Sequence, residues 1–194
     1  VPCGHHDGLI TLPGPRKLLQ EGAMAQDTRD FAIALCSASL LLRWLVGLQG
    51  YSGEGTPPKF GDFEAQRHWM EVTWHLPVGE WYTNTTNNDL QYWGLDYPPL
   101  TAYWSWVWAL VAQWIDPDFV QLLHSRGLES PSLKVFMRTS VLVSDILVLL
   151  PACWLLVGRV SSRTRQARTV LAAVLLSPAL IIVDHGHFQV NRGG

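Results

Sequence analysis

Three long apolar runs constrain the fold of this chain more than any other feature of its sequence. They cover residues 31–48, 136–157 and 169–183, and the last can be extended to residue 186. A helix needs about 20 apolar residues to cross the hydrocarbon core of a membrane. Charged residues make up 15% of the chain, whereas soluble domains average about 25%. The sequence therefore predicts an all-α membrane protein with transmembrane helices at 31–48, 136–157 and 169–186.

The first run, and a shorter fourth run at residues 100–115, each allow a second interpretation. A removable signal peptide is the alternative for the first run. The run lacks an obvious small-residue cleavage site, however, and Arg43 lies near its end, where the side chain can snorkel to the membrane surface. The 100–115 run has 16 residues, and four of them are tryptophans. This composition favours an amphipathic helix that lies in the membrane interface over one that crosses.

Charge distribution sets the expected orientation of the spans. The loop at 158–168 contains four arginines and no acid, and such short loops usually face the cytosol. Residues 49–135 then form one long lumenal loop, in which ten acids outnumber four bases. The Asn84-Thr85-Thr86 sequon supports this side, because N-glycosylation occurs in the lumen. If 100–115 crossed the membrane, the arginine-rich loop would face the lumen instead.

The residues before Met24 have no periodicity and include His5 and His6 among glycines and prolines. We predict that Met24 is the true start, that residues 1–23 are a non-native or disordered leader, and that residues 1–30 as a whole are a leader and cytosolic tail. The histidine pair allows metal binding, but a structureless leader accounts for this composition more simply.

The remaining composition argues against two further classes of protein. The cysteines are Cys3, Cys36 and Cys153, and their spacing outlines neither a disulfide framework nor a zinc site. A formal net charge of -2 gives no electrostatic support for nucleic-acid binding. We therefore expect no disulfide framework, no zinc site and no nucleic-acid partner.

The long loop contains two expected helices and one notable carboxylate. Residues 63–75 lack glycine and proline and place apolar side chains on one helical face, and a second helix should begin at Pro98-Pro99. Asp62 is expected at the N-cap of the first helix. It either only caps the helix, or it serves as a base for a sugar hydroxyl, because a helix N-terminus keeps a carboxylate ionised.

Charged residues also occur within the apolar runs. Asp145 lies near the middle of the second run with Arg138 nearer its start, and intramembrane charges tend to be paired or functional. Arg43 in the first run is a candidate partner for Asp145. The polar residues at 184–191, after the third run, either only face water at the membrane interface or bind a phosphate leaving group.

Two longer segments carry a resemblance to a known family. They are residues 61–71 (GDFEAQRHWME) and 92–103 (YWGLDYPPLTAY), and shorter matches follow at 125–127, 136–139 and 186–189. These segments resemble the dolichyl-phosphate-glucose-dependent alpha-1,3-glucosyltransferases of N-glycan precursor assembly. The likeness covers about residues 31–191. It is closer to the enzyme that adds the first glucose than to the sibling that adds the second.

The resemblance implies a multi-span fold of the GT-C type in the endoplasmic reticulum membrane. The first lumenal loop, with two membrane-parallel helices, would form much of a lumenal active site. The implied reaction is an inverting transfer that needs no metal or cofactor. Glucose passes from dolichyl phosphate glucose to the oligomannose arm of a lipid-linked oligosaccharide.

Residue by residue, Asp62 matches the catalytic base of the family. The positions implied near the substrates are Glu64, Arg67, His68, Asp96, Tyr97 and His187. The family continues beyond residues 187–194, which form a truncated lumenal end here, so we expect no activity from these 194 residues alone. The rival functions are a transporter or scramblase of lipid-linked sugars and a noncatalytic form that binds donor.

Overall fold

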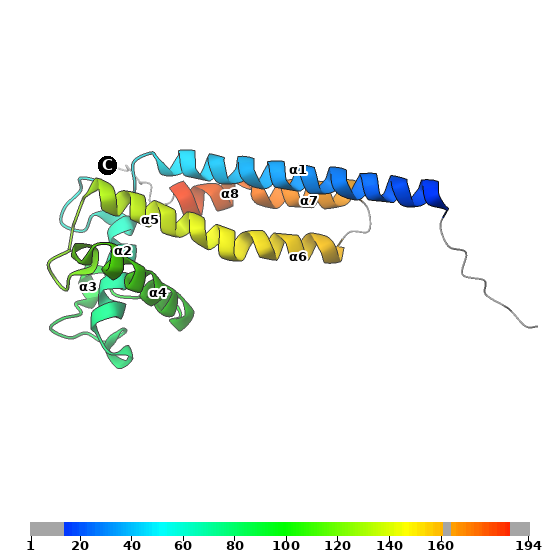
Figure 1. Ribbon diagram of the computed structural model, residues 1–194. Coiled ribbons are helices and arrows are strands. Elements are labelled where there is room, and N and C mark those ends of the chain that lie inside the picture. Colours follow the sequence, from blue (N-terminus) through cyan, green and yellow to red (C-terminus); the bar gives the residue numbers. More distant parts are fainter. Residues whose placement is uncertain (1–13, 161–163, 187–194) are drawn as a thin grey trace, which may run out of the picture.

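The computed structural model describes residues 14–160 and 164–186, and within these residues every regular element is helical. A bundle of long helices carries a compact helical cap at one end (Figure 1). The bundle elements are α1 (Pro15–Gly47), α5 (Pro131–Ser144), η3 (Asp145–Leu149), α6 (Leu150–Val160), α7 (Thr164–Leu175), α8 (Pro178–Leu180) and η4 (Ile181–Gly186).

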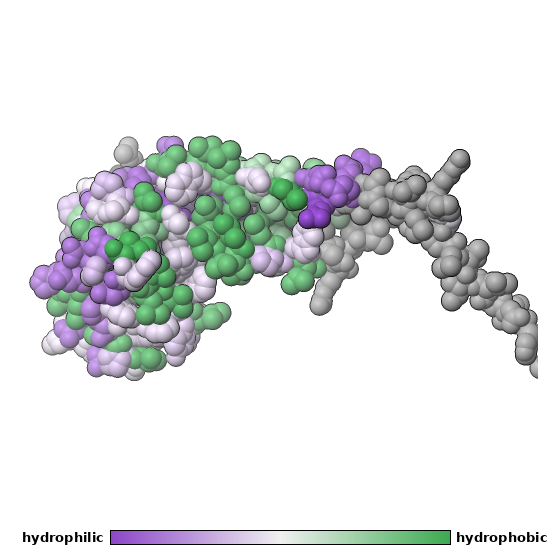
Figure 2. Space-filling model, viewed as in Figure 1, coloured by the Kyte–Doolittle hydropathy of each residue, from purple (hydrophilic) through white to green (hydrophobic). Residues whose placement is uncertain are grey.

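Three stretches of the bundle are long and apolar enough to cross a membrane: Gln26–Gly47, Pro131–Leu155 and Arg165–Gly186. They overlap the three predicted runs, so the prediction of an all-α protein with three membrane-spanning helices is confirmed. Large apolar side chains on the bundle surface, such as Leu147 and Trp154, are exposed. Figure 2 shows these hydrophobic surfaces along the bundle and more hydrophilic residues over the cap.

The first helix is longer than the sequence pattern indicated. It begins at Pro15, nine residues before Met24, although we expected no regular structure there. Proline at the first helical position fits the helix geometry, and the following residues are mostly strong helix formers. The disordered alternative for residues 1–23 is therefore wrong from Pro15 onward, whereas the non-native leader and the start at Met24 stay predictions. Residues 1–13 lie outside the described part.

Prolines interrupt the other two spans. The second span contains a π-turn, η3, directly before Pro151, whose missing N–H cannot bond the preceding turn. In the third span, α7 ends before Pro178 and the chain restarts as α8 and η4. The break at Pro178 lies in the capward half of the third span, whereas η3 lies just past the middle of the second span.

The cap consists of the chain between α1 and α5. Its elements are α2 (Gly61–His75), η1 (Val78–Glu80), α3 (Leu90–Trp93), α4 (Pro99–Ile115) and η2 (Pro117–Val120). Helix α2 runs across the long direction of the bundle and packs against α4 (Figure 1). The expected helices at 63–75 and from Pro99 are both present. The end of α6 and the start of α7, on which the described arginines of the 158–168 segment lie, are at the opposite end of the bundle.

Apolar contacts fix the cap to the bundle. Buried Phe63 and Met70 of α2 cluster with Phe119 of η2 and with Phe136 of α5. A second cluster, centred on Trp69 and Trp81, packs within the cap. The first cluster joins α2 directly to the second span, and this contact orients α2 against the bundle.

Helix α2 starts earlier than the sequence predicted. Phe60 occupies the N-cap position in a left-handed conformation (φ 55), and Gly61 is the first helical residue. The prediction that Asp62 is the N-cap is therefore wrong, and Asp62 lies in the first turn instead. The backbone of Ser52 passes close to Gly61 and sets this start of α2. A Cβ atom on Gly61 (φ +66) would come within 2.5 Å of the Ser52 carbonyl group. Only glycine fits there.

Candidate functional site

A charged cluster inside the bundle joins all three spans. Asp145 Oδ2 lies 2.8 Å from Nε of Arg43 in α1 and 2.7 Å from Nε2 of His185 in η4. Arg43 also donates to the carbonyl of Leu175 at 2.8 Å. These side chains are buried, and buried charges require partners of this kind. The expected pairing of Asp145 with Arg43 is confirmed.

Arg138 connects the same region to the beginning of the cap. Its Nη1 donates to the carbonyl of His185 at 2.6 Å, and its Nη2 donates to the carbonyl of Gly50 at 3.1 Å. Gly50 lies just after α1 and two residues before Ser52. The end of the third span and the first turn of the cap are therefore held together by one guanidinium group.

The two faces of α2 have different environments. With 3.6 residues per turn, Glu64, Arg67 and Glu71 share one face, and Asp62 and Gln66 share the opposite face. The first set points into the cap, where all three side chains are buried. The second set points toward the bundle, and its members are only half-buried.

The buried face is built around Arg67, whose side chain is 0% exposed. Its guanidinium donates to both carboxylate oxygens of Glu64 at 2.6 and 2.7 Å and to Oε2 of Glu71 at 2.7 Å. It also donates to the hydroxyl of Ser125 at 2.5 Å and the carbonyl of Phe119 at 3.3 Å. Arg67 therefore links α2 to the segment after α4.

Glu71 completes this network, and its pKa reflects the surrounding donors. Burial by itself raises the pKa of Glu71, but the hydrogen bond from His68, the charge of Arg67 and the Leu123 N–H outweigh burial and lower it to about 2. The Leu123 N–H lies 2.8 Å from Oε1. Burial lowers the pKa of Arg67, but Glu64 and Glu71 raise it above its ordinary value. The network is therefore ionic at neutral pH.

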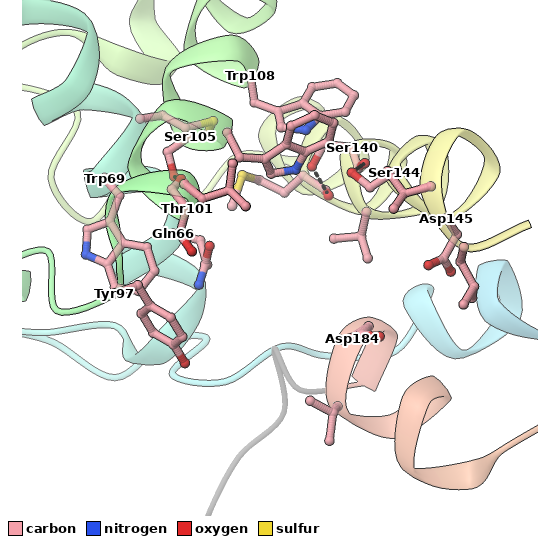
Figure 3. A pocket seen from close by; sticks show the side chains of 18 of the residues that line it. Gln66, Trp69, Tyr97, Thr101, Ser105, Trp108, Ser140, Ser144, Asp145 and Asp184 are labelled. Atoms are coloured by element: carbon pink, nitrogen blue, oxygen red, sulfur yellow. Dashed lines mark hydrogen bonds between the residues drawn. The ribbon is translucent and has the colours of Figure 1, made fainter. Parts of the chain in front are cut away.

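The opposite face of α2 borders a cavity of about 920 Å³ between cap and bundle. Figure 3 shows Gln66, Trp69 and Tyr97 on the cap side and Asp145 and Asp184 on the bundle side. The Trp69 and Tyr97 rings are 5.2 Å apart between centroids. The other lining residues are mostly apolar, from α4, α5, η3, α6 and α8. A mostly apolar cavity with a few converging polar groups is typical of a ligand site.

Asp62 lies one turn of α2 before Gln66, and Gln66 lines this cavity. Its Oδ2 accepts a hydrogen bond from the Ser52 hydroxyl at 3.1 Å, and its backbone N–H points to the same hydroxyl oxygen at 3.4 Å. Its position in the first turn of α2 also exposes it to the positive end of the helix dipole. A carboxylate held in this way can accept a proton from a hydroxyl group that enters the cavity.

The structure divides the residues that the sequence singled out. Tyr97 lines the cavity, and Asp62 lies one turn before the lining residue Gln66. Glu64, Arg67 and His68 lie in the buried network. Asp96 is exposed next to Tyr97, and Asn84 is exposed with its Oδ1 accepting from the Leu90 N–H at 3.2 Å. His187 lies outside the described residues.

Sequence reasoning missed three residues of this region: Ser52, Gln66 and Glu71. Ser52 lies in a glycine-rich turn ten residues before Asp62, where no periodicity points to it. The spacing of Glu71 from Glu64 and Arg67, at i+7 and i+4, was a usable signal for a helical charge network. Within residues 14–160 and 164–186, no group of three or more His, Cys, Asp or Glu side chains is placed to hold a metal ion.

Comparison with known proteins adds an independent observation. The ALG6, ALG8 glycosyltransferase family matches residues 39–193. The chain is 53% identical over 154 residues to the dolichyl pyrophosphate Man9GlcNAc2 alpha-1,3-glucosyltransferase of Gallus gallus, covering 79% of this chain and 30% of that protein. The enzyme of that name from Saccharomyces cerevisiae is 47% identical over 170 residues, covering 84% and 30%.

The chain spans about a third of the length of the curated relatives it matches. The region that the family matches includes α2, the cavity, the second and third apolar helices and the end of the first. A match over residues 39–193 and identities near one half are far above the level that fold similarity alone produces. The chain belongs to the ALG6, ALG8 glycosyltransferase family.

Proposed function

We propose that the whole protein transfers glucose from dolichyl phosphate glucose to a Man9GlcNAc2 lipid-linked oligosaccharide, forming an alpha-1,3 linkage. The main support is Asp62, whose carboxylate is held by Ser52 one helical turn before Gln66, a residue that lines the cavity between cap and bundle. The names of the relatives support the acceptor and the linkage. The donor is inferred from the family resemblance.

In the proposed reaction, the carboxylate of Asp62 accepts the proton of the acceptor mannose 3-hydroxyl. The hydroxyl oxygen attacks the anomeric carbon of glucose, and the dolichyl phosphate departs from the opposite face, so the configuration inverts. One carboxylate is sufficient, because phosphate leaves as a stable anion without a general acid. A positioned general base contributes about 10²- to 10⁴-fold to the rate of such a step.

The other residues act in supporting ways in this proposal. The buried network of Glu64, Arg67 and His68 holds α2 in place. These residues fix the position of Asp62 and do not contact the substrates themselves. Tyr97 lines the cavity on the cap side, and Asp96 is exposed next to it in the chain; both are proposed to contact a sugar. His187, which follows the third span, is proposed to contact the phosphate.

The lipid part of the substrates fits the apolar lining of the cavity. Trp104 and Trp108 of α4 and Val148 of η3 face the same space, and their surfaces can pack against an isoprenoid chain. Asp62 belongs to α2 of the cap, one turn before the lining residue Gln66. A lipid-linked sugar whose chain follows the bundle would therefore present its head group near Asp62.

We further propose that the first glucose is added, because the relatives are named for an acceptor, Man9GlcNAc2, that contains no glucose. The sibling reaction that adds the second glucose is the alternative. A noncatalytic transporter or binding protein for lipid-linked sugars is less well supported, since it would not require a positioned carboxylate. The 194 residues alone are proposed to be inactive, because two thirds of the length of the relatives is not represented.

The proposed location is the endoplasmic reticulum membrane, with the cap in the lumen. The arginine-rich sequence at 158–168 supports this orientation, because its described parts, the end of α6 and the start of α7, lie at the other end of the bundle. The exposed Asn84 provides a direct test. A glycan removable by endoglycosidase, and absent from Asn84→Gln, is expected in cells, whereas protease cleavage near residue 163 from the lumenal side would contradict the orientation.

The function itself is tested by purified full-length protein reconstituted in lipid. It is given dolichyl phosphate glucose with either the bare oligomannose acceptor or a monoglucosylated acceptor. We expect transfer to the bare acceptor, with an alpha-linked product. Transfer only to the monoglucosylated acceptor would establish the sibling reaction, and binding of donor without transfer to either would establish a noncatalytic protein.

A further inference from the structure

We propose that Ser52 is a positioning residue for the reaction, fixing the carboxylate of Asp62 in the orientation that takes the acceptor proton. The proposal rests on the proposed function of Asp62 as a base. Ser52 lies outside α2, ten residues before Asp62, and does not itself contact substrate in this account. It acts only through the carboxylate.

The local geometry carries the proposal. The Ser52 hydroxyl donates to Oδ2 of Asp62 at 3.1 Å, and the same hydroxyl oxygen lies 3.4 Å from the Asp62 backbone nitrogen. One hydroxyl therefore contacts both the main chain and the side chain of Asp62. Ser52 is 7% exposed, so water has little access to its hydroxyl. The aspartate side chain is restrained relative to the first turn of α2.

The chain around Ser52 is itself held on both sides. Arg138 binds the Gly50 carbonyl, and the Tyr51 ring stacks on Phe63 with 4.0 Å between centroids. A Cβ atom on Gly53 (φ +79) would lie 2.1 Å from the Phe60 carbonyl carbon. These contacts place the 50–53 segment tightly against the start of α2, so the Ser52 hydroxyl has a defined position.

The hydrogen bond has a specific chemical consequence for the base. A hydroxyl that donates to Oδ2 restrains the rotation of the carboxylate group. The carboxylate then meets an entering hydroxyl group in a defined orientation. A proton-transfer step requires heavy atoms within about 2.6–3.2 Å, and a displacement near 1 Å costs on the order of 10²-fold in rate.

The test compares single-residue variants of the full-length protein in the reconstituted transfer assay. Ser52→Ala removes the hydroxyl and is expected to lower kcat roughly 10- to 100-fold, while KM for donor and acceptor changes less than about threefold. Ser52→Thr keeps a hydroxyl and is expected to recover most of kcat. The matched control is Tyr51→Phe, which removes a hydroxyl-to-carboxylate hydrogen bond of equal length, 3.1 Å to Glu129, and should leave kcat unchanged.

Asp62→Asn and the double variant with Ser52→Ala complete the design. If Ser52 acts through Asp62, adding Ser52→Ala to Asp62→Asn causes no further loss. An inactive Asp62→Asn with a fully active Ser52→Ala overturns the positioning role and leaves the proposed function intact. An active Asp62→Asn overturns both. Equal losses in Ser52→Ala and Tyr51→Phe would show general loosening of the segment, and this result also contradicts the proposal.

Discussion

Replacing Arg67 by methionine should open the cap while leaving the bundle folded. Arg67 makes five hydrogen bonds of 2.5 to 3.3 Å, to Glu64, Glu71, Ser125 and the Phe119 carbonyl. Methionine has a similar length but no donors, so two buried carboxylates lose their counter-ion. Removing one partner of a buried ion pair costs about 3–5 kcal/mol. Whole domains have only about 5–15 kcal/mol of stability.

Hydrogen–deuterium exchange of the full-length protein in lipid measures this cost locally. A loss of about 3–5 kcal/mol corresponds to a hundredfold or greater increase in exchange of α2 and the 119–126 segment, because local opening is governed by its free energy. Exchange in α1 and α5 should change little. Arg168→Met is the matched control, since its pair with Asp27 is partly exposed and such pairs contribute less than about 1 kcal/mol.

A double variant, Arg67→Met with Glu71→Gln, separates loss of the bonds from the presence of unpaired charge. Because the second change removes one uncompensated carboxylate, we expect the double variant to exchange more slowly than Arg67→Met alone. The reasoning is refuted if Arg67→Met exchanges within about threefold of the wild type. It is also refuted if the double variant is less protected than the single one.

Three further predictions concern other parts of the structure. Gly61→Ala places a Cβ atom against the Ser52 backbone at a position with left-handed φ, and it should lower the free energy of unfolding by about 1–2 kcal/mol or more. Thermal unfolding measures this loss, and Gly79→Ala is the control because Gly79 has open space around it. Asp145→Ala leaves Arg43 buried without its carboxylate and should lower the stability of the bundle by about 3–5 kcal/mol, which we expect to reduce the monodisperse fraction on size exclusion. Adding Arg43→Met to the same chain removes the unpaired charge and should restore much of that fraction. The pKa of Glu71 falls from its ordinary value of 4.5 to about 2 on folding. Its contribution to cap stability is therefore present above pH 4.5 and is lost as the pH falls toward 2. An acid titration monitored by tryptophan fluorescence should show this loss of stability, and Glu71→Gln should abolish this pH dependence.

The sequence predicted the parts of the fold that depend on long-range averages. Apolar runs of 18 residues or more locate the spans whatever their partners are, because the membrane requirement is a matter of length and composition. The Arg43–Asp145 pairing could also be anticipated, since an isolated intramembrane charge needs a partner. Pro151 and Pro178 were visible in the sequence, but their effect on helix geometry depends on neighbouring turns.

The details of the site depend on contacts between distant segments, and the sequence pattern could not supply them. The start of α2 moved to Gly61 because the Ser52–Gly53 backbone crosses it, which is a tertiary constraint. Whether Glu64 and Arg67 face substrate or the cap interior depends on which side of α2 meets the bundle. Helical periodicity places them together but does not say what covers them.

The most direct test of the central claim is the single-turnover rate of glucose transfer by full-length Asp62→Asn in lipid. The exposed Asp118 of η2 provides a matched control as Asp118→Asn. The account predicts a fall of at least about 10²-fold for Asp62→Asn, with acceptor binding retained, and an unchanged rate for Asp118→Asn. An Asp62→Asn rate within a few fold of the wild type would contradict the assignment of Asp62 as the base.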